Sequence, residues 1–389
     1  MIQKVKGNSQ WVVVFIGMLS IFVGLGLARF GYTPILEPMR DALQLTYTHM
    51  GMIASANFLG YVALSPFVGY LASKYGSKRV AAISLFFTSI TMILTGLVNS
   101  FIQAAFLRFL TGAGSAGVNV SIVGLASKWF GVERRGLALG IINAGSSVGI
   151  ITVGFAIPAI VASFPEGWRM GWLFMGVVGL AVTILSLFLK ESPEKAVSSA
   201  GVLGITAVYR SSALLKLGLV YTLFGLSYII FATFYASHLV NLGFDIAMAG
   251  YFWSFVGFFS IFSTTIWGAV SDKIGRQKGL AIVYVLLGTS ILIFGLSSTL
   301  PGLILGTVMA GAVIFAIPSI VQAYCGDIAG GEAAAAAIGF VTLFFGVGQM
   351  IGPSIGGYLA DLTGNFTASL SFAGITAITG GVLTLLRGD

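Results

Sequence analysis

The chain has 389 residues, of which 57% are hydrophobic and only 8% are charged. Soluble domains carry about 25% charged residues, because their surface faces water. This composition therefore excludes a soluble protein and indicates a chain embedded in lipid. A single cysteine, Cys325, excludes a disulfide framework, and two histidines exclude the common metal sites. We expect neither a metal nor a cofactor.

Twelve apolar segments of the chain are long enough to cross a membrane. A bilayer core about 30 Å thick requires about 20 residues of helix. Glycine, proline, asparagine and charge clusters separate the segments. We place the spans near residues 11–36, 50–72, 79–98, 101–125, 136–161, 169–189, 213–239, 247–270, 279–298, 301–323, 335–360 and 367–386. The predicted fold is an all-α membrane protein with twelve transmembrane helices.

The Lys and Arg residues indicate how these spans are oriented. With the N-terminus inside, 16 of the 20 basic residues fall on the cytoplasmic side, as the positive-inside rule requires. We predict a multi-pass protein of the bacterial cytoplasmic (inner) membrane with both termini in the cytoplasm. The lipid bilayer explains the net charge of +8, so we expect no nucleic-acid partner.

A repeat relates the two parts of the sequence. An offset of 199 residues superimposes nine pairs of glycines, from Gly26 with Gly225 to Gly149 with Gly348. The longest connection lies between the sixth and seventh spans. We predict an N-terminal six-helix half at 1–189, a cytoplasmic linker at 190–212 and a C-terminal six-helix half at 213–389. Parallel repeats of this kind are typical of secondary transporters, whose substrate site lies at mid-membrane depth.

Two loops carry a recognisable motif. The loop between the second and third spans reads Gly69-Tyr-Leu-Ala-Ser73-Lys74-Tyr-Gly76-Ser-Lys78-Arg79. Its repeat reads Gly268-Ala-Val-Ser-Asp272-Lys273-Ile-Gly275-Arg276-Gln-Lys278. Both resemble the signature of the major facilitator superfamily, and the fourth span carries the similar element Arg108-Phe-Leu-Thr-Gly112-Ala-Gly114. This resemblance implies a transporter and not an enzyme, and the spans contain no recognisable catalytic pairing.

Further segments resemble one branch of that superfamily. They read Ala28-Arg29-Phe30-Gly31-Tyr32-Thr33-Pro34, Gly348-Gln349-Met-Ile-Gly352-Pro353 and Asp361-Leu-Thr-Gly364. Together they look most like the YbfB/YjiJ-like branch. The resemblance implies two pseudo-symmetric halves that expose one site alternately to each side of the membrane.

The loop motifs predict a cytoplasmic gate. Gly69 and Gly268 lack a side chain where we expect two helix ends to approach closely. Asp272 is expected to accept hydrogen bonds from a helix N-terminus or to pair with Arg134 or Arg135. An alternative is that these charges are solvated anchors. The predicted gate residues are Gly69, Ser73, Lys74, Arg79, Arg134, Arg135, Gly268, Asp272 and Arg276. Because Ser73 carries no charge, we expect the N-terminal half of the gate to be weaker.

Arg29 and Arg108 lie within spans, where an arginine costs about 2.5–3.5 kcal/mol to insert. No acidic residue lies in a mid-span position, so the site is expected to be electropositive and to favour an anion that supplies the missing counter-charge. Arg29 and Tyr32 are expected to share a helix face at a spacing of three. The candidate substrate-binding residues are Arg29, Tyr32, Asn57, Arg108, Asn119, Asn143, Tyr228, Gln322 and Gln349.

Each candidate also has a packing interpretation. Arg29 could reach the outer headgroups, or a carboxylate among Glu37, Asp41 and Asp361. Arg108 could bind backbone carbonyls of neighbouring helices. The amide side chains could form hydrogen bonds between helices.

From these observations we predict a monomeric secondary transporter of a small organic anion such as a monocarboxylate. A coupling ion or counter-substrate is a further possible partner. Export of amphipathic drugs or metabolites in exchange for protons is an alternative, although no buried acid is present to carry the proton. A transporter-like receptor that binds its ligand without net transport is a second alternative.

Overall fold

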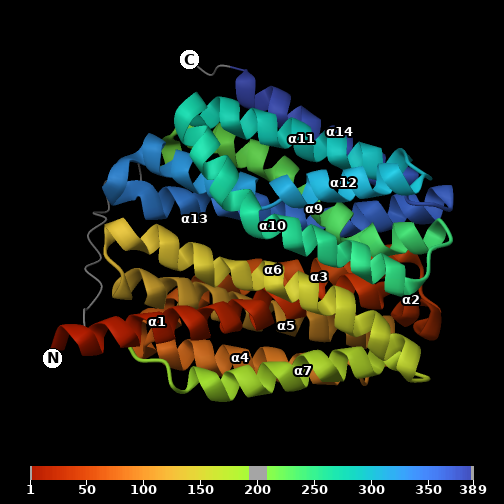
Figure 1. Ribbon diagram of the computed structural model, residues 1–389, viewed down its shortest axis with the longest axis horizontal. Helices are drawn as coiled ribbons and strands as arrows, with labels where there is room; N and C mark the ends of the chain where they lie inside the picture. Colours follow the sequence, from red (N-terminus) through yellow and green to blue (C-terminus); the bar gives the residue numbers. More distant parts are fainter. Residues whose placement is uncertain (1, 192–207, 387–389) are drawn as a thin grey trace. The chain divides into compact units, whose positions relative to one another are not determined.

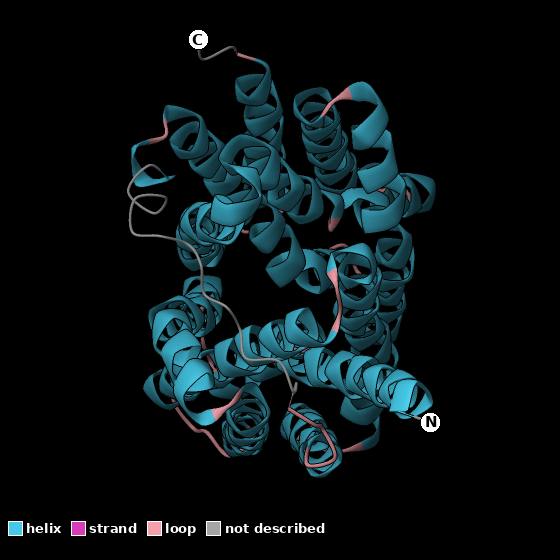
Figure 2. Cartoon of the chain, turned by 90° about the vertical axis from the view of Figure 1, so that its left-hand side faces the viewer, coloured by secondary structure: helices cyan, strands magenta, loops and turns pink. Residues whose placement is uncertain are grey.

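The structure, a computed structural model, describes residues 2–191 and 208–386, and within them all side chains except those of residues 2–9, 132–133, 331–332 and 335. Every described element is a helix, and loops connect them (Figure 2). The described residues contain twelve helical segments long and apolar enough to cross a membrane. The predicted all-α fold is therefore confirmed. Most of the linker predicted at 190–212 lies outside the described residues.

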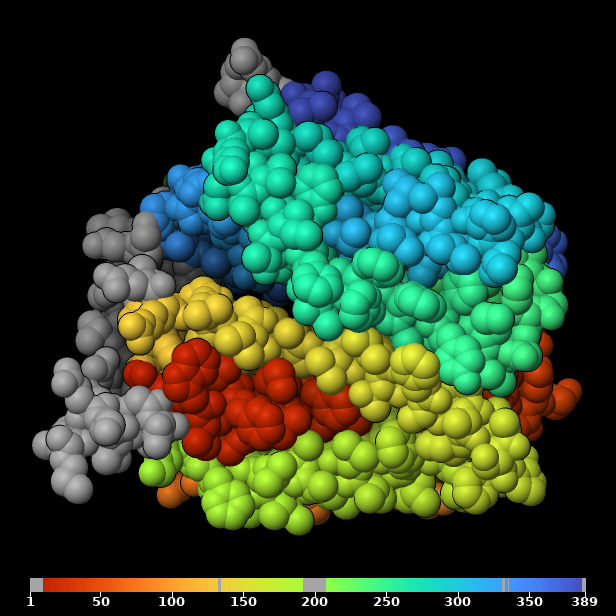
Figure 3. All heavy atoms as spheres, in the orientation of Figure 1, coloured from red at the N-terminus to blue at the C-terminus, as the bar shows by residue number. Residues whose placement is uncertain are grey.

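The chain divides into two compact units, of which the first contains Met1–Leu45 and Ala56–Val197. Its helices, labelled in Figure 1, are α1 (Ile2–Ile21), η1 (Phe22–Phe30), α2 (Tyr32–Leu43), the larger part of α3 (Tyr47–Tyr75), α4 (Ser77–Thr95), α5 (Phe101–Trp129), α6 (Val132–Ser163) and α7 (Gly167–Ser186). Helix α4 packs against α5 and α7, and α6 packs against α1 and η1. Figure 3 shows α1, in red, lying between α6 and α7 on one face of this unit.

The second unit contains Thr46–Ser55 and Ser198–Asp389. Its helices are α9 (Ser212–Asn241), α10 (Ile246–Ile274), α11 (Arg276–Leu296), α12 (Leu300–Val313), α13 (Ala316–Thr363) and α14 (Thr367–Leu385), together with the start of α3. Helix α13 packs along α9, and α11 packs along α14 (Figure 1). A non-helical residue, Gly330, interrupts α13, so its two parts belong to two successive spans.

The two units repeat the same backbone contacts. A methyl group added to Gly112 would lie 1.8 Å from Asn57 O, and one added to Gly311 would lie 2.9 Å from Val256 O. Asn57 and Val256 are themselves related by the 199-residue offset. Glycine at these positions lets two helices approach closely, because no Cβ separates their backbones. The offset read from the sequence therefore corresponds to a repeat in packing.

The backbone conformation at two further positions of the repeat requires glycine. Gly76 has φ 94° and ψ 140°, and Gly275 has φ 93° and ψ 142°. Each residue separates two successive helices, α3 from α4 and α10 from α11. Only glycine adopts this positive φ without strain. Gly76 and Gly275 thus form the same turn between successive helices in the two units.

The first span differs from the prediction of one regular helix at 11–36. It contains the π-helix η1 between α1 and α2, and a turn at Gly31 follows it. π-Helical turns widen the helix and often occur at functional sites. Arg29 lies in η1, whereas Tyr32 begins α2. The two residues therefore lie in different helical elements, and the shared face stays a prediction.

Candidate functional site

The guanidinium group of Arg29 lies between two aromatic rings of α3. Its central carbon is 4.7 Å from the ring centroid of Phe58 and 4.9 Å from that of Tyr61. Phe58 and Tyr61 follow each other at a spacing of three, so both point from the same side of α3. A guanidinium group held over ring faces is attracted by their negative charge density. The two rings therefore stabilise and orient the Arg29 side chain.

The polar edge of Arg29 has no protein partner among the described residues. Its buried Nε and Nη2 atoms lack a hydrogen-bond acceptor, and no described carboxylate forms an ion pair with it. The residue itself is only partly buried. Buried charged donors usually have partners, because an unsatisfied one costs free energy. A bound anion would supply the missing acceptors.

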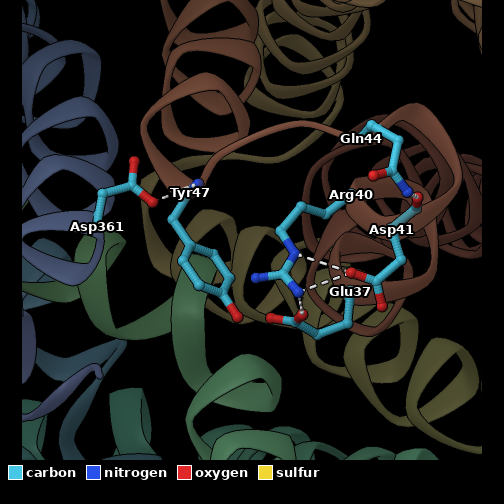
Figure 4. Close-up of polar contacts among 6 residues, drawn as sticks. All are labelled: Glu37, Arg40, Asp41, Gln44, Tyr47 and Asp361. Atoms are coloured by element: carbon cyan, nitrogen blue, oxygen red, sulfur yellow. Dashed lines mark hydrogen bonds and ion pairs between the residues drawn. The ribbon is translucent and has the colours of Figure 1, made fainter. Parts of the chain in front are cut away.

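The carboxylates considered as partners for Arg29 are engaged elsewhere. Arg40 pairs with Asp41 at 2.7 Å and with Glu37 at 3.5 Å (Figure 4). Asp361 accepts hydrogen bonds from the start of α3. Contact of Arg29 with the lipid headgroups stays an alternative prediction.

Asn119 extends the Arg29 environment onto α5. Its Nδ2 donates a 2.6 Å hydrogen bond to the hydroxyl oxygen of Tyr61. Asn119 is partly buried, like Arg29. We call Arg29, Phe58, Tyr61 and Asn119 the Arg29 cluster. The sequence analysis identified Arg29 and Asn119 but missed the two aromatic residues, whose spacing of three on one span was the available signal.

Arg108 has a different environment, although it lies in the same unit. It is 1% exposed, and its Nη1 donates a 2.5 Å hydrogen bond to Ala28 O. Its central carbon lies 5.2 Å from the ring of Tyr32 and 5.1 Å from that of Trp172. This is the backbone-carbonyl role considered as the alternative for Arg108. A contact of Arg108 with substrate stays a prediction.

Tyr32 and Asn57 both contact Arg108. Tyr32 is 2% exposed. Asn57 is fully buried, and its Nδ2 donates a 3.1 Å hydrogen bond to Arg108 O. Such amide-to-backbone bonds hold neighbouring membrane helices together. The structure therefore places these two candidates in the packing between helices.

Tyr228 and Gln349 meet in the second unit. Gln349 Nε2 donates a hydrogen bond to the Tyr228 hydroxyl, and both side chains are buried. The Tyr228 ring stacks on Phe224 with centroids 4.7 Å apart. The aromatic residues of α9 thus pack tightly against one another. Asn143 and Gln322 are exposed on α6 and α13, apart from this pair.

The two motif glycines predicted to pack closely do not do so. A methyl group added to Gly69 or Gly268 would meet no atom within 4 Å. The prediction that helix ends approach each other closely at these two glycines is wrong for the observed arrangement. Close backbone contacts occur instead within the spans, at glycines such as Gly112 and Gly311.

The acid of the second loop motif has a partner close by. Asp272 forms an ion pair with Arg276, which also lies 3.3 Å from Asp327 and donates a 2.7 Å hydrogen bond to Ser271. Arg276 therefore links α10, α11 and α13. The proposed pairing of Asp272 with Arg134 or Arg135 stays a prediction; both arginines are exposed in the first unit.

The first loop motif lacks the acid, and a different residue supplies the negative charge. Glu191 follows α7, and its Oε1 accepts a 2.6 Å hydrogen bond from Lys78 N at the start of α4. A carboxylate at a helix N-terminus satisfies a free N–H and favours the helix dipole. Sequence reasoning missed this role of Glu191. Ser73 and Arg79 are exposed, and Lys74 lies over the rings of Tyr70 and Tyr75.

No group of three His, Cys, Asp or Glu side chains with metal-ligand geometry occurs in the part of the chain that the structure describes. The Arg29 cluster is suited to binding a ligand. A planar cation with free donors binds carboxylate or sulfonate groups through paired hydrogen bonds.

Comparison with known proteins identifies the family of the chain. The family model for "Uncharacterised MFS-type transporter YbfB" matches residues 21–385. The probable sulfoacetate transporter SauU of Cupriavidus necator is 25% identical over 382 residues, covering 89% of this chain and 86% of that protein. The hexuronate transporter of Bacillus subtilis is 23% identical over 363 residues, covering 87% of this chain and 86% of that protein.

Solved structures show the same fold. A bacterial homologue of the human lysosomal transporter Spinster, inward-facing and unoccupied, superimposes with a TM-score of 0.79 at 15% identity and covers 98% of this chain and 95% of its own. The nucleoside transporter NupG gives a TM-score of 0.76 at 15% identity, with 97% of each chain covered. The resemblance to the major facilitator superfamily and its YbfB branch is confirmed. The chain therefore belongs to the family of the uncharacterised MFS-type transporter YbfB, and it is a multi-pass integral membrane transporter and not an enzyme.

Proposed function

We propose that this protein is a secondary transporter of small organic anions that carry a single negative charge, such as monocarboxylates or monosulfonates. The observation that carries the proposal is the Arg29 guanidinium, which has buried donors without a partner and lies between Phe58 and Tyr61. An anion that enters this position gains two charge-assisted hydrogen bonds. It also removes the cost of the unsatisfied donors.

The charge count supports a monoanion. Arg108 already donates to Ala28 O and is 1% exposed, so Arg29 is the more accessible of these two arginines. The second unit has no Lys or Arg between residues 217 and 272 or between 279 and 386. One guanidinium group balances one negative charge, and a second charge on the ligand would remain desolvated without a partner.

The relatives support the substrate class without fixing the compound. Two of them are named for organic acids, sulfoacetate and hexuronates. Sulfoacetate carries two acidic groups, whereas a hexuronate carries one carboxylate. The Arg29 cluster favours the second kind of ligand.

The fold and the charge pattern support a transport cycle by alternating access. Two repeated sets of six spans support alternating access, in which one site opens first to one side and then to the other. The predominance of Lys and Arg on one side of the predicted spans supports a bacterial cytoplasmic membrane with both termini inside. The loop residues Arg276, Asp272 and Asp327 are proposed to hold the cytoplasmic side of the second unit together.

Counterflow in proteoliposomes tests the proposal. Purified protein is reconstituted with unlabelled glucuronate, lactate or isethionate inside, and uptake of the matching labelled anion is followed. We expect uptake of at least one labelled monoanion. This uptake should be lost in Arg29→Gln, and an excess of the neutral amide of that monoanion should not change it. Binding without exchange would instead favour a receptor, and uptake of cationic amphiphiles alone would favour the exporter; either result contradicts the proposal.

A further inference from the structure

The side-chain amide of Asn119 has hydrogen-bonding capacity that the described residues do not use. An asparagine amide offers two N–H donors and an oxygen with two lone pairs. Among the described residues, Asn119 forms one side-chain hydrogen bond, from Nδ2 to the hydroxyl oxygen of Tyr61 at 2.6 Å. Its second N–H and its Oδ1 are therefore left for another partner.

Two other amides of the spans are enclosed by packing, whereas Asn119 is not. Asn57 is fully buried and donates to a backbone carbonyl of α5. Gln349 is 2% exposed and donates to the hydroxyl of Tyr228, which is 3% exposed. Asn119 is only partly buried, and its Oδ1 is not one of the buried polar atoms without a partner. A ligand can therefore reach the amide of Asn119.

A single tyrosine side chain connects this amide with Arg29. The hydroxyl of Tyr61 is bonded to Asn119, and the centroid of its ring lies 4.9 Å from the guanidinium carbon of Arg29. Arg29 lies in η1, Tyr61 in α3 and Asn119 in α5, and all three residues belong to the first unit. One short ligand can therefore contact the guanidinium group and the amide together.

The guanidinium group and the amide match different groups on a ligand. The buried donors of Arg29 lack acceptors, and a carboxylate supplies two of them. The amide of Asn119 is neutral and offers both a donor and an acceptor, which matches a hydroxyl group, because a hydroxyl also donates and accepts. A second carboxylate would offer acceptors only and would place its charge beside the Asn119 oxygen. A hydrocarbon group would form no hydrogen bond with the amide.

We propose that Asn119 is a hydroxyl-binding subsite beside Arg29, and that the transported monoanion is a hydroxy acid. The proposal rests on the proposed function, because Arg29 holds the carboxylate. The ligand hydroxyl donates to Asn119 Oδ1 or accepts from the second N–H of Nδ2. Tyr61 orients the amide through the existing hydrogen bond. Asn119 thus selects hydroxylated anions over aliphatic anions of the same charge.

The hydrogen bond between Asn119 and Tyr61 also joins α5 to α3, and this packing role makes a different prediction. An amide that serves only to hold two helices together gives no preference for a hydroxyl group on a ligand. Pairs of ligands that differ only in that hydroxyl group therefore distinguish the subsite from packing. The charge is equal within each pair, so the contribution of Arg29 cancels.

Calorimetric binding to the full-length protein in lipid nanodiscs tests the subsite. The first pair is lactate and isobutyrate, in which a methyl group replaces the hydroxyl. The second pair is 3-hydroxybutyrate and 3-methylbutyrate, which moves the hydroxyl one carbon further from the carboxylate. In at least one pair, the hydroxy acid should bind about tenfold more tightly, as expected for one net hydrogen bond.

Two variants assign this preference to Asn119. Asn119→Leu removes the amide and keeps a side chain of similar size, so the ratio of the two affinities should fall to about one. Thr183→Val is the matched control, because Thr183 lies in α7 and its hydroxyl donates to Gly179 O of the same helix at 2.8 Å. This variant should leave the ratio unchanged.

Two results would overturn the subsite: equal binding of hydroxy acid and methyl analogue in both pairs for the wild type, or a ratio that persists in Asn119→Leu. The wild-type comparison remains decisive even where Asn119→Leu does not fold. The neutral amides of the same ligands separate this proposal from the anion proposal. Carboxylates that bind more tightly than their amides, without a hydroxyl preference, would refute the subsite alone. Preference for lactamide over isobutyramide, without a preference for carboxylates, would refute the anion proposal and support the subsite.

Discussion

The amide of Asn119 donates a 2.6 Å hydrogen bond to the hydroxyl of Tyr61. This bond fixes the ring that lies 4.9 Å from the Arg29 guanidinium carbon. The arginine itself has buried donors without protein partners. An unpartnered cation is thus held in position by residues that do not neutralise it, which leaves its charge for a ligand.

Two substitutions of Tyr61 should distinguish the contribution of the aromatic ring to anion affinity from that of the hydroxyl group. Tyr61→Phe keeps the aromatic face over Arg29 and loses only the hydrogen bond to Asn119, which is worth about 1 kcal/mol, or about fivefold in anion affinity. Tyr61→Leu removes the ring and should cost about 2 kcal/mol, or about 30-fold. The measurement is the half-saturating anion concentration in counterflow. Equal effects of the two substitutions would show that the ring face does not position Arg29.

The two intramembrane arginines should respond differently to the same substitution. Arg108→Gln removes a buried guanidinium group that donates to Ala28 O, and it should lower the free energy of unfolding by about 1.5–3 kcal/mol. Arg29→Gln removes a cation whose buried donors are unpaired, so the ligand-free protein should be at least as stable as the wild type. Thermal denaturation of both purified variants without anion measures this contrast. Greater destabilisation by Arg29→Gln would show that Arg29 has a structural partner.

Substitution of glycine by alanine should lower stability at packed positions and not at open ones. Gly112→Ala places a methyl group 1.8 Å from Asn57 O and should destabilise the protein by about 1–3 kcal/mol through overpacking. Gly69→Ala is the matched control, because its methyl group meets no atom within 4 Å. Denaturation midpoints of the two variants test the difference. If Gly69→Ala lost as much stability as Gly112→Ala, the open environment of the motif glycine would be incorrect.

The fold could be predicted from sequence because lipid imposes it. Helices are the structure that satisfies backbone hydrogen bonds within an apolar chain of this kind, and the spacing of glycines revealed the repeat. The repeat also predicted real contacts, since Gly112 and Gly311 pack on Asn57 and Val256. What the pattern did not show was which glycines pack: Gly69 and Gly268 belong to the motif, yet a methyl group added to either would meet no atom within 4 Å.

The site was less predictable because it depends on which way side chains point. Arg29 and Tyr32 are three residues apart, a spacing that places both on one face of an α-helix. Arg29 lies in the π-helix η1, the turn at Gly31 precedes Tyr32, and Tyr32 packs near Arg108. Composition likewise could not show that Arg108 donates to a backbone carbonyl whereas the buried donors of Arg29 have no acceptor. That distinction depends on Ala28 O, which approaches Arg108 only in the folded chain.

The role of Asp361 shows a similar limit. Its sequence position placed it at the outer end of the eleventh predicted span. Its partners, Tyr47 and Thr48, begin α3 in the second predicted span. A cap between helices so distant in sequence leaves no local pattern, unlike the cap of Asp245 on Met248 within α10.

Binding of matched anions and neutral analogues to the purified protein, with and without Arg29→Gln, tests the central claim most directly. Thermal shift or calorimetry is measured with monocarboxylates, monosulfonates, dicarboxylates and the corresponding amides. We predict that a monoanion binds the wild type more tightly than its neutral amide or its dianionic analogue, and that Arg29→Gln abolishes this preference. An anion preference that survives Arg29→Gln at full strength would contradict the assignment of Arg29 as the anion-binding residue.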